Sequence, residues 1–476
     1  MHLSTLAIIM FYIVNLALSV FIVFKGRKRP AQTWAWILVM TFIPIIGFII
    51  YLLFGRDLTK DNIYSLDDKE RIGFTKELKQ QRQQLRDGQL DLPHFGRLKI
   101  EPLIDMLSVS GGSLYTTGNQ IDLFIDGIEK FNHLMEDMDR AEKHIHIEYF
   151  CMESDALGTA VRDHLVAAAK RGVKVKLLLD AWGSSGIKPH FLDPLREAGG
   201  EISFFLPYLM RLNYRNHRKV VVIDGKIGYI GGFNIGDEYL GLRRKMGYWR
   251  DNHLRIRGAA VRSLQSHFLK DWNASRKTNE PYQPEYFPEI EVEGDYPVQI
   301  IASGPDSPME QIKMTYLKMI NMAKEEILIQ TPYYIPDDSI HEALKAALLS
   351  GVKVKLQIPD KPDHILIYWA TYSLSAELVE YGAEVEIYKN GFIHAKTMII
   401  DGKIASVGSA NIDIRSFRLN FEINSVIYNQ EFAQELCHQF ALVSTQCQNL
   451  TMEQYEKRSH LIKIKEGLAR LIQPLL

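Results

Sequence analysis

Two long apolar runs open the chain, and shorter strand-like and helix-like patterns fill the rest. Residues 3–24 and residues 33–54 each form an uncharged stretch of 22 residues, about the length that crosses a hydrocarbon core of roughly 30 Å as a helix. A short basic connector, residues 25–32, separates the two runs. The pattern predicts a transmembrane hairpin over residues 1–56, which either crosses the bilayer twice or dips into one leaflet.

Other interpretations of these runs fit less well. A cleaved signal peptide would carry a basic segment before the apolar stretch and a small-residue cleavage site, and neither is present. A buried core hairpin would not need runs of this length. The orientation in the membrane stays open, because the basic residues after the second run nearly balance those of the connector. These later residues are Arg56, Lys60, Lys69 and Arg71.

Polar segments flank the central part of the chain. Residues 57–109 are interpreted as a juxtamembrane linker, and Lys69–Arg86 within it reads as a polar helix or as a solvated connector. Residues 451–476 predict an amphipathic helix that either lies on a membrane surface or packs on the protein's own domain. Its apolar positions recur at helical spacing among basic residues: Leu461, Ile464, Leu468 and Leu471.

Between these segments the chain repeats itself. The string Val-Lys-Val-Lys-Leu occurs at residues 173–177 and again at residues 352–356, each time inside an alternation of strand-like and helix-like patterns. Such an order predicts α/β/α domains, each with a mixed, largely parallel sheet and helices on both faces. We expect two duplicated domains, residues 110–290 and residues 291–450, that pack about a pseudo-twofold axis.

A motif of the form H-x-K-x-x-x-x-D occurs once in each half, and the copies begin 177 residues apart. After each copy, a turn of small residues ends at an asparagine. The residues concerned are His217, Lys219, Asp224 and Asn234 in the first half and His394, Lys396, Asp401 and Asn411 in the second. Two matches with matching flanks are hard to attribute to chance.

The motif suits chemistry on a phosphodiester. Alternation along a strand places each histidine and its lysine on one face. Lysines and asparagines of both halves can bind the non-bridging oxygens and stabilise a five-coordinate transition state. One imidazole attacks phosphorus to form a phosphohistidine, while the other protonates the leaving oxygen and then deprotonates the incoming alcohol or water. Neither a metal nor a cofactor is needed, because the lysines supply the positive charge.

Four carboxylates accompany the motifs. Asp224 and Asp401 either take part in catalysis or hold the turn that follows. Asp251 and Glu422 follow the motifs at distances that suit partners for fixing the histidine tautomers. A metal site is the rival interpretation, and it fails because each histidine is paired with a lysine, which cannot ligate a metal while protonated.

These motifs resemble those of the phospholipase D superfamily, over about residues 110–445. Within it the chain is similar to bacterial cardiolipin synthases. The segments that carry this likeness are Thr33–Trp36, Pro44–Phe48, Gly231–Tyr239 and Trp249–Asp251. The resemblance implies a cell-membrane enzyme that transfers a phosphatidyl group from one phosphatidylglycerol to the hydroxyl of another, releasing glycerol. It also implies that His217 is the nucleophile and His394 the acid/base.

Other functions remain open at this point: a hydrolytic phospholipase D, a membrane-tethered nuclease and a non-catalytic scaffold. The formal net charge of −1 gives no general attraction to nucleic acid, so phosphatidylglycerol and membrane lipids are the expected partners. The three cysteines lack the spacing of a disulfide framework or a zinc site. An alcohol acceptor must outcompete water, so we expect an apolar pocket. Its candidate lining residues, which could equally be core residues, are Tyr333, Tyr334, Trp369 and Tyr372.

Overall fold

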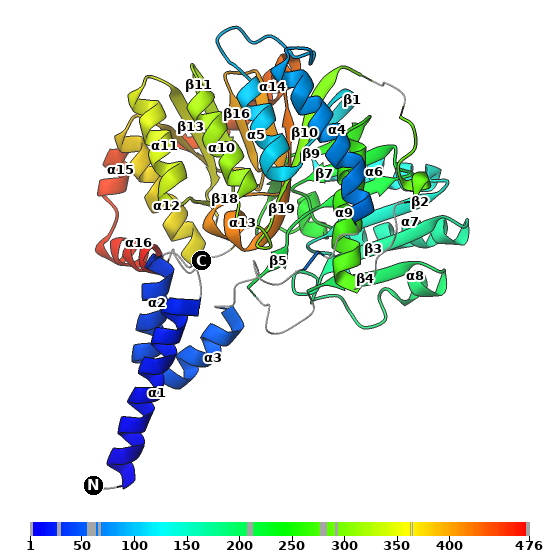
Figure 1. Cartoon of the computed structure of the whole chain (residues 1–476). Coiled ribbons are helices and arrows are strands. Elements are labelled where there is room, and N and C mark those ends of the chain that lie inside the picture. The colour runs from blue at the N-terminus through cyan, green and yellow to red at the C-terminus, as the bar shows by residue number, and fades with distance from the viewer. Residues whose placement is uncertain are drawn as a thin grey trace.

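Three helices project from a two-lobed α/β body (Figure 1). The structure, a computed structural model, describes residues 3–25, 30–54, 63–64, 68–206, 213–276, 283–290, 294–361, 363 and 365–472. Residues 26–29 of the basic connector, together with Arg56 and Lys60, lie outside the described residues. Helices α4 (Asp68–Arg86) and α5 (Glu101–Gly111) lead into the body, so the polar segment after the hairpin is helical.

The first lobe follows the predicted alternation of strands and helices. It consists of β1 (Tyr115–Phe124), α6 (Gly127–Arg140), β2 (His144–Tyr149), α7 (Ala156–Lys170), β3 (Lys174–Asp180), α8 (Asp193–Glu197), β4 (Glu201–Phe205), β5 (Arg215–Asn216), β6 (Val220–Ile223), β7 (Ile227–Gly231), β8 (Tyr248–Arg250), β9 (His253–Arg257) and α9 (Val261–Arg276).

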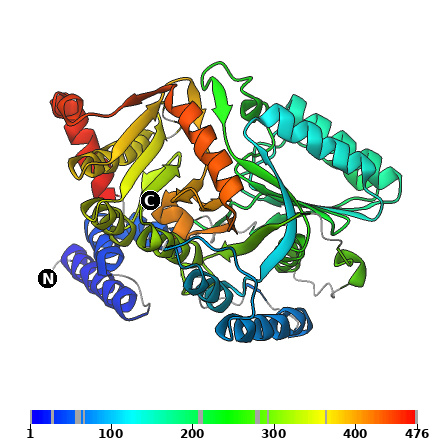
Figure 2. The same ribbon diagram turned by 90° about the horizontal axis from the view of Figure 1, so that it is seen from above.

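The second lobe repeats this order, and Figure 2 shows it beside the first. It consists of β10 (Tyr296–Ser303), α10 (Gln311–Met322), β11 (Glu326–Gln330), β12 (Tyr334–Ile335), α11 (Asp338–Leu349), β13 (Lys353–Pro359), α12 (Ile365–Glu380), β14 (Glu384–Tyr388), β15 (Gly391–Ile393), β16 (Thr397–Ile400), β17 (Ile404–Gly408), β18 (Ile412–Asp413), α13 (Ile414–Arg418), β19 (Asn420–Ile427), α14 (Gln430–Ser444) and β20 (Cys447–Asn449). Helices α15 (Met452–Glu456) and α16 (His460–Ile472) follow.

One mixed sheet runs through both lobes, in the order β20-β14-β13-β11-β16-β17-β19-β10-β1-β9-β7-β6-β2-β3-β4. The order reads almost the same from either end, and the antiparallel pair β1–β10 joins the lobes, with Tyr115 opposite Gln299. The prediction of a largely parallel sheet is wrong. Along this order, only the neighbours within β2-β3-β4 and β11-β13-β14 are parallel. The Asp-Gly turns at the ends of the motifs fold β6–β7 and β16–β17 into antiparallel hairpins.

Alternating side chains of the central strands bury on both faces of the sheet. Val221 and Ile223 of β6 pack in a core with α6 and α7, whereas Val220 and Val222 pack toward α9. The α9 face is shared, because Ile399 of β16 and residues of α14 belong to the same hydrophobic cluster. The two lobes therefore have one core in common as well as one sheet.

The N-terminal runs form helices α1 (Leu3–Lys25), α2 (Pro30–Phe42) and α3 (Pro44–Phe54). The second run, expected as one span, bends at Ile43 before Pro44, which lacks the backbone N–H that a continuous helix needs. Gly47 lies so close to the Val39 carbonyl that a Cβ would be 2.8 Å from its oxygen. Trp36 and Tyr51 pack edge to face, with ring centroids 5.3 Å apart. In the part of the chain that is described, no helix is both long and apolar enough to cross a membrane.

Candidate active site

Short parallel ladders between the lobes position both motif histidines. Strand β5 pairs with β19 of the second lobe, and the His217 N–H donates to the Phe421 carbonyl at 2.9 Å. Strand β15 pairs with β8 of the first lobe, and the His394 N–H donates to the Arg250 carbonyl at 2.7 Å. The apolar runs within the motifs form β6 and β16, so each histidine and its lysine stand just ahead of a strand rather than inside it.

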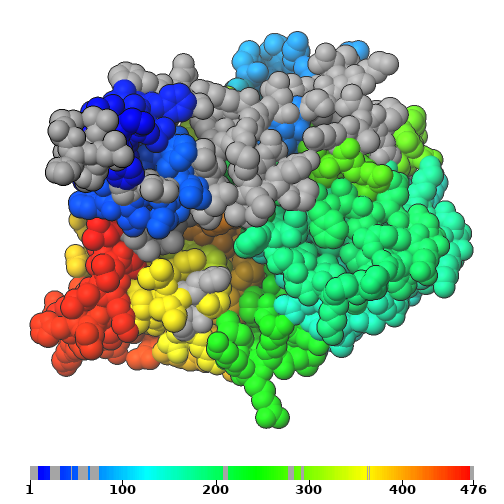
Figure 3. Space-filling model, turned by 90° about the horizontal axis from the view of Figure 1, so that it is seen from below, coloured from blue at the N-terminus to red at the C-terminus, as the bar shows by residue number. Residues whose placement is uncertain are grey.

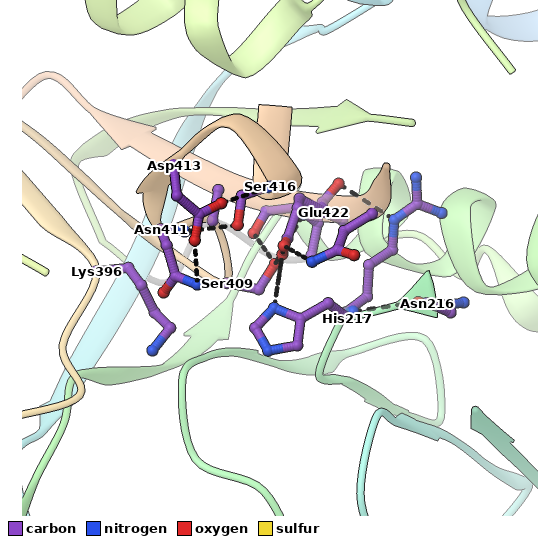
Figure 4. Close-up of polar contacts among 12 residues, drawn as sticks. Asn216, His217, Lys396, Ser409, Asn411, Asp413, Ser416 and Glu422 are labelled. Atoms are coloured by element: carbon purple, nitrogen blue, oxygen red, sulfur yellow. Dashed lines mark hydrogen bonds and ion pairs between the residues drawn. The ribbon is translucent and has the colours of Figure 1, made fainter. Parts of the chain in front are cut away.

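The carboxylate partners are exchanged between the lobes. His217 Nδ1 lies 3.0 Å from both Glu422 carboxylate oxygens, and His394 Nδ1 lies 2.6 Å from Asp251 Oδ2. Each carboxylate comes directly after the residue whose carbonyl holds the histidine backbone. Because a carboxylate only accepts hydrogen bonds, Nδ1 carries the proton in each neutral imidazole and Nε2 is left with its lone pair. Figure 4 shows the His217 pair.

The two motif lysines extend from opposite lobes toward the same site. The Lys219 ammonium donates to the His217 carbonyl at 2.6 Å, and the Lys396 ammonium donates to the His394 carbonyl. Burial, together with the nearby charge of Lys396, lowers the pKa of Lys219 to about 7, and burial lowers the pKa of Lys396 to about 8. Figure 4 shows Lys396 and His217 extending to the same side of the second-lobe residues around them.

Burial also sets the protonation of the histidines. It lowers the pKa of His217 to about 4, although the Glu422 carboxylate opposes this shift. The pKa of His394 is well below its usual value, because of burial and then the positive charges of Lys396 and Lys219. Without a substrate anion, both imidazoles are therefore neutral near pH 7.

The two carboxylates differ in their surroundings. Ser409 donates to Glu422 Oε2 at 2.5 Å, and the Asn420 amide donates to Oε1 at 3.1 Å. Burial opposes ionisation of Glu422, but His217, Lys219 and the Ser409 hydroxyl together lower its pKa. Burial raises the pKa of Asp251 to about 6. Neither Ser409 nor Asn420 was predicted as a site residue; the serine in the second small-residue turn is the one sequence signal that points to them.

The small-residue turn after the first motif has no room for a serine equivalent to Ser409. Gly232 occupies the place of Ser409, and a Cβ there would lie 2.1 Å from Asp251 Oδ1. The close approach requires glycine at this position. Whereas Glu422 accepts from a serine hydroxyl, Asp251 accepts from the backbone N–H of Asn252 at 2.7 Å.

The two asparagines are buried next to their motifs. The Asn234 amide donates to the Tyr239 hydroxyl at 2.9 Å. The Asn411 amide donates to Asp413 Oδ2 at 3.2 Å, whereas its Oδ1 has no hydrogen-bond partner among the described residues. Burial raises the pKa of Asp413 to about 6.

Asp224 and Asp401 hold turns, at positions remote from the imidazoles. The Asp224 carboxylate accepts from the backbone N–H groups of residues 142–144, at 2.8 to 2.9 Å. Asp401 accepts in the same way from residues 324–326, at 2.8 to 3.1 Å. Both have positive φ, 54° and 52°. Their carboxylates therefore tie the end of each motif strand to the start of β2 or β11, which fits the turn-holding alternative.

A pocket opens beside the second-lobe half of the site. It is lined by Pro332, Tyr333, Ile358, Pro359, Lys361, Asp363, Tyr368, Thr371 and Tyr372. Asp363, one of the lining residues, raises the pKa of Lys396 through its charge. Of the aromatic residues expected here, Tyr333 and Tyr372 line the pocket. Tyr334 is a core residue bonded to His341, and Trp369 packs against the same core.

The chain is similar to known proteins along its whole length. A family model described as "Cardiolipin synthase, PLD-like domain" matches residues 134–272 and 316–443, and one described as "Phospholipase_D-nuclease N-terminal" matches residues 13–56. The major cardiolipin synthase ClsA of Bacillus subtilis (strain 168) is 46% identical over 482 residues, covering 100% of both chains. The cardiolipin synthase of Oceanobacillus iheyensis is 45% identical over 480 residues, also covering 100% of both.

The chain therefore belongs to the cardiolipin synthase family of phospholipase D-like proteins, as the motifs indicated. Among solved structures, the phosphatidylserine synthase of Haemophilus influenzae Rd KW20 superposes with a TM-score of 0.59, at 16% identity, over 75% of this chain and 95% of that chain. This likeness shows that the two-lobed fold is shared.

Proposed function

We propose that this chain is a cardiolipin synthase, which transfers a phosphatidyl group from one phosphatidylglycerol to a second and releases glycerol. The observation that carries the proposal is the crossed pairing of His217 with Glu422 and of His394 with Asp251. This pairing supports one composite site with two Nε2 lone pairs and two lysine ammoniums. Similarity to cardiolipin synthases over the full length of the chain supports the choice of substrate.

The first step breaks the bond between phosphorus and the glycerol oxygen. Nε2 of His217 attacks phosphorus and forms a P–N bond, while His394 donates a proton to the departing glycerol oxygen. The phosphodiester anion raises the pKa of His394 when it binds, because it adds negative charge to a buried site. Lys219 and Lys396 stabilise the extra charge on the non-bridging oxygens, with Asn234 and Asn411 beside them.

The second step returns the enzyme to its starting state. A glycerol hydroxyl of the second phosphatidylglycerol gives its proton to His394, and its oxygen attacks phosphorus. The P–N bond breaks, cardiolipin leaves and His217 recovers its lone pair. The same histidine thus acts first as acid and then as base, so each turnover balances its protons without any other group.

The surroundings of the two carboxylates favour His217 as the nucleophile. A phosphorylated imidazole is cationic, so it is stabilised by a partner that remains ionised. Glu422 is such a partner, because Ser409 and Asn420 donate to it and its pKa is lowered. Asp251, with its raised pKa, suits a histidine that gains and loses a proton in every cycle.

The motif aspartates have a supporting place in this scheme. Asp224 and Asp401 fix the strands that follow the histidines, by accepting from backbone amides. The aromatic pocket around Tyr333 and Tyr372 supports selection of an alcohol over water, because apolar walls lower the local water concentration.

We further propose that residues 1–56 anchor the enzyme in the cell membrane. The described part of α1 exposes large apolar side chains, among them Met10, Ile13 and Leu16, and such exposure indicates a lipid or protein environment. Two crossings are the arrangement expected from the two apolar runs. A Gly26→Cys variant in which Cys151, Cys437 and Cys447 are replaced by serine is then expected, in sealed vesicles, to react with a membrane-impermeant thiol reagent only from the side opposite the lobes. Reaction from the side of the lobes would indicate insertion into one leaflet.

The decisive experiment incubates the purified full chain with phosphatidylglycerol alone. We expect cardiolipin and glycerol in equal amounts. Phosphatidic acid with glycerol would show a hydrolytic phospholipase D, which uses the same two histidines with water as acceptor. The absence of any lipid product from a folded chain would contradict both activities, and a His394→Ala variant serves as the inactive control.

A further inference from the structure

Helix α16 turns its apolar side chains outward. Leu461, Ile464, Leu468 and Leu471 are 70, 58, 57 and 76% exposed, whereas Glu466 is only 3% exposed and Ala469 is fully buried. A surface helix of a soluble protein has the opposite arrangement, with its apolar stripe toward the core. This outward row of four residues is called the α16 stripe below.

Polar contacts hold the helix in this inverted orientation. Arg470 Nη1 lies 2.5 Å from Glu377 Oε1 of α12, and Glu466 Oε2 accepts from Arg458 Nε at 2.8 Å and from the Tyr455 hydroxyl at 3.1 Å. Lys465 lies over the Trp369 ring of α12, with Nζ 5.5 Å from its centroid. The stripe is therefore outward because its opposite face is fixed, and it is not a frayed end.

The stripe continues onto the first turn of α12, where Ile365 and Leu366 are 67 and 48% exposed. The next turns of α12 carry Tyr368 and Tyr372, which line the pocket beside Lys396. One helix thus connects the outward apolar surface with the proposed acceptor pocket.

The location of α16 indicates what covers it. Figure 1 shows α16 running crosswise to α1 at the level where the N-terminal helices meet the body, and Figure 3 shows α16 (red), α12 (yellow) and α1–α3 (blue) adjacent on the underside. Lys463 and Lys465 flank the stripe and are exposed. Cations beside an outward apolar stripe complement an anionic lipid surface.

We propose that the α16 stripe and the first turn of α12 insert into the interfacial region of an anionic phospholipid leaflet, next to the N-terminal anchor. This inference rests on the proposed lipid substrate and deepens it. Docking through α16 holds the mouth of the Tyr333–Tyr372 pocket at the bilayer surface, where a second phosphatidylglycerol enters without leaving the membrane.

Photocrosslinking tests the proposal without requiring turnover. The full chain carries p-benzoylphenylalanine in place of Leu468, and a matched chain carries it in place of Leu442, which is 46% exposed on α14 on the far side of the lobes from α1. Both are reconstituted in phosphatidylglycerol vesicles, irradiated and analysed by mass spectrometry of the labelled peptide. We expect lipid adducts at position 468 and none at position 442.

Other outcomes overturn the proposal. A crosslink from position 468 to a second chain would show a protein interface, and a crosslink to α1–α3 would show that the stripe is covered within the chain. Equal lipid adducts at both positions, or none at either, would show no specific docking. Because a His394→Ala chain can be crosslinked in the same way, loss of catalysis and loss of docking are distinguished.

A second variant links docking to catalysis. Leu468→Asp places a carboxylate at a position that is already 57% exposed, so the fold is kept, and it is expected to lower cardiolipin formation on vesicles about tenfold. The rate on phosphatidylglycerol in detergent micelles, where no bilayer surface has to be reached, is expected to match that of the unaltered chain. An unchanged rate on vesicles, or an equal loss in micelles, would contradict the proposal; Leu442→Asp is the control.

Discussion

The two lobes carry the same motif but give their histidines different partners. In the second lobe a serine and an asparagine support Glu422, which holds the histidine of the first lobe. In the first lobe, a glycine takes the place of that serine, and Asp251 holds the histidine of the second lobe with the support of a backbone amide. The two halves therefore share one geometry but differ in the hydrogen-bond donors around their carboxylates.

This difference shows how a symmetric fold can run an asymmetric reaction. Nucleophilic attack needs a partner that stays ionised beside a cationic phosphohistidine, and proton transfer needs a group whose charge changes in each cycle. The lowered pKa of Glu422 and the raised pKa of Asp251 match these two tasks. The comparison therefore supports the proposed roles, which the motif leaves undecided because it has the same form in both halves.

Removal of either histidine is the most severe test. His217→Ala and His394→Ala are each expected to lower cardiolipin formation by about 10³-fold or more, since one deletes the nucleophile and the other the proton carrier. With phosphorus-labelled phosphatidylglycerol, His394→Ala should still form a slow, acid-labile phosphoenzyme, and His217→Ala should form none. A phosphoenzyme found only in His217→Ala would reverse the assignment.

Replacement of each carboxylate by its amide should reduce activity to different extents in the two lobes. Glu422→Gln is expected to reduce kcat by about 10²–10⁴-fold, because it removes the anion beside the phosphohistidine and disturbs the tautomer of His217. Asp251→Asn is expected to lower kcat by about 10–100-fold. Ser409→Ala removes only one donor to Glu422, so it should lower kcat less than Glu422→Gln, by an amount corresponding to about 0.5–1.5 kcal/mol. Equal losses for Glu422→Gln and Asp251→Asn would remove the basis for unequal roles.

Because the pKa values of the two motif lysines are lowered, we expect a loss of activity at high pH. Lys219 and Lys396 bind phosphate only while protonated, and burial places their pKa values at about 7 and about 8. As pH rises through these values, kcat/KM is expected to fall at least about tenfold between pH 7 and pH 9. Lys219→Arg stays charged throughout this range, so its lower overall activity should show no inflection near pH 7. An unchanged pH profile in that variant would mean that Lys219 does not titrate in the free enzyme.

The turn aspartates should affect stability more than chemistry. Asp224→Ala and Asp401→Ala each leave backbone amides without an acceptor, and each is expected to lower the free energy of unfolding by about 1–3 kcal/mol. Asparagine tolerates positive φ and keeps an oxygen acceptor, so Asp224→Asn and Asp401→Asn are the matched controls. The folded fraction of every variant should retain kcat within about threefold. A large loss of kcat without loss of stability would instead make these residues catalytic.

Much of this organisation could be predicted from repetition in the sequence. The duplicated lobes and the positions of β2, β3, β11 and β13 follow from local patterns of alternating apolar residues. The meeting of His217 and Lys396 in one site follows from the two copies of the motif, because a duplicated domain that packs about a twofold axis brings equivalent residues together.

Features that depend on distant contacts could not be read in this way. Glu422 lies 205 residues from His217 along the chain, and no local pattern states that its partner belongs to the other lobe. The sheet was expected to be largely parallel because hairpins and crossovers look alike in short apolar runs. The bend at Ile43 escaped prediction because a proline is tolerated in many apolar helices, and only the packing of Gly47 on Val39 shows that the chain folds back here.

The seam of backbone hydrogen bonds between β1 and β10, with the core that α9 and α14 share, has a consequence for turnover. The shared sheet and core join the two lobes firmly, so neither lobe can move aside to release a product. In the proposed reaction, glycerol therefore has to depart, and the second lipid has to arrive, without separation of the lobes, while the phosphorus stays bound to His217. A bulky alcohol that binds beside the phosphorus but cannot attack it is then expected to inhibit without reacting.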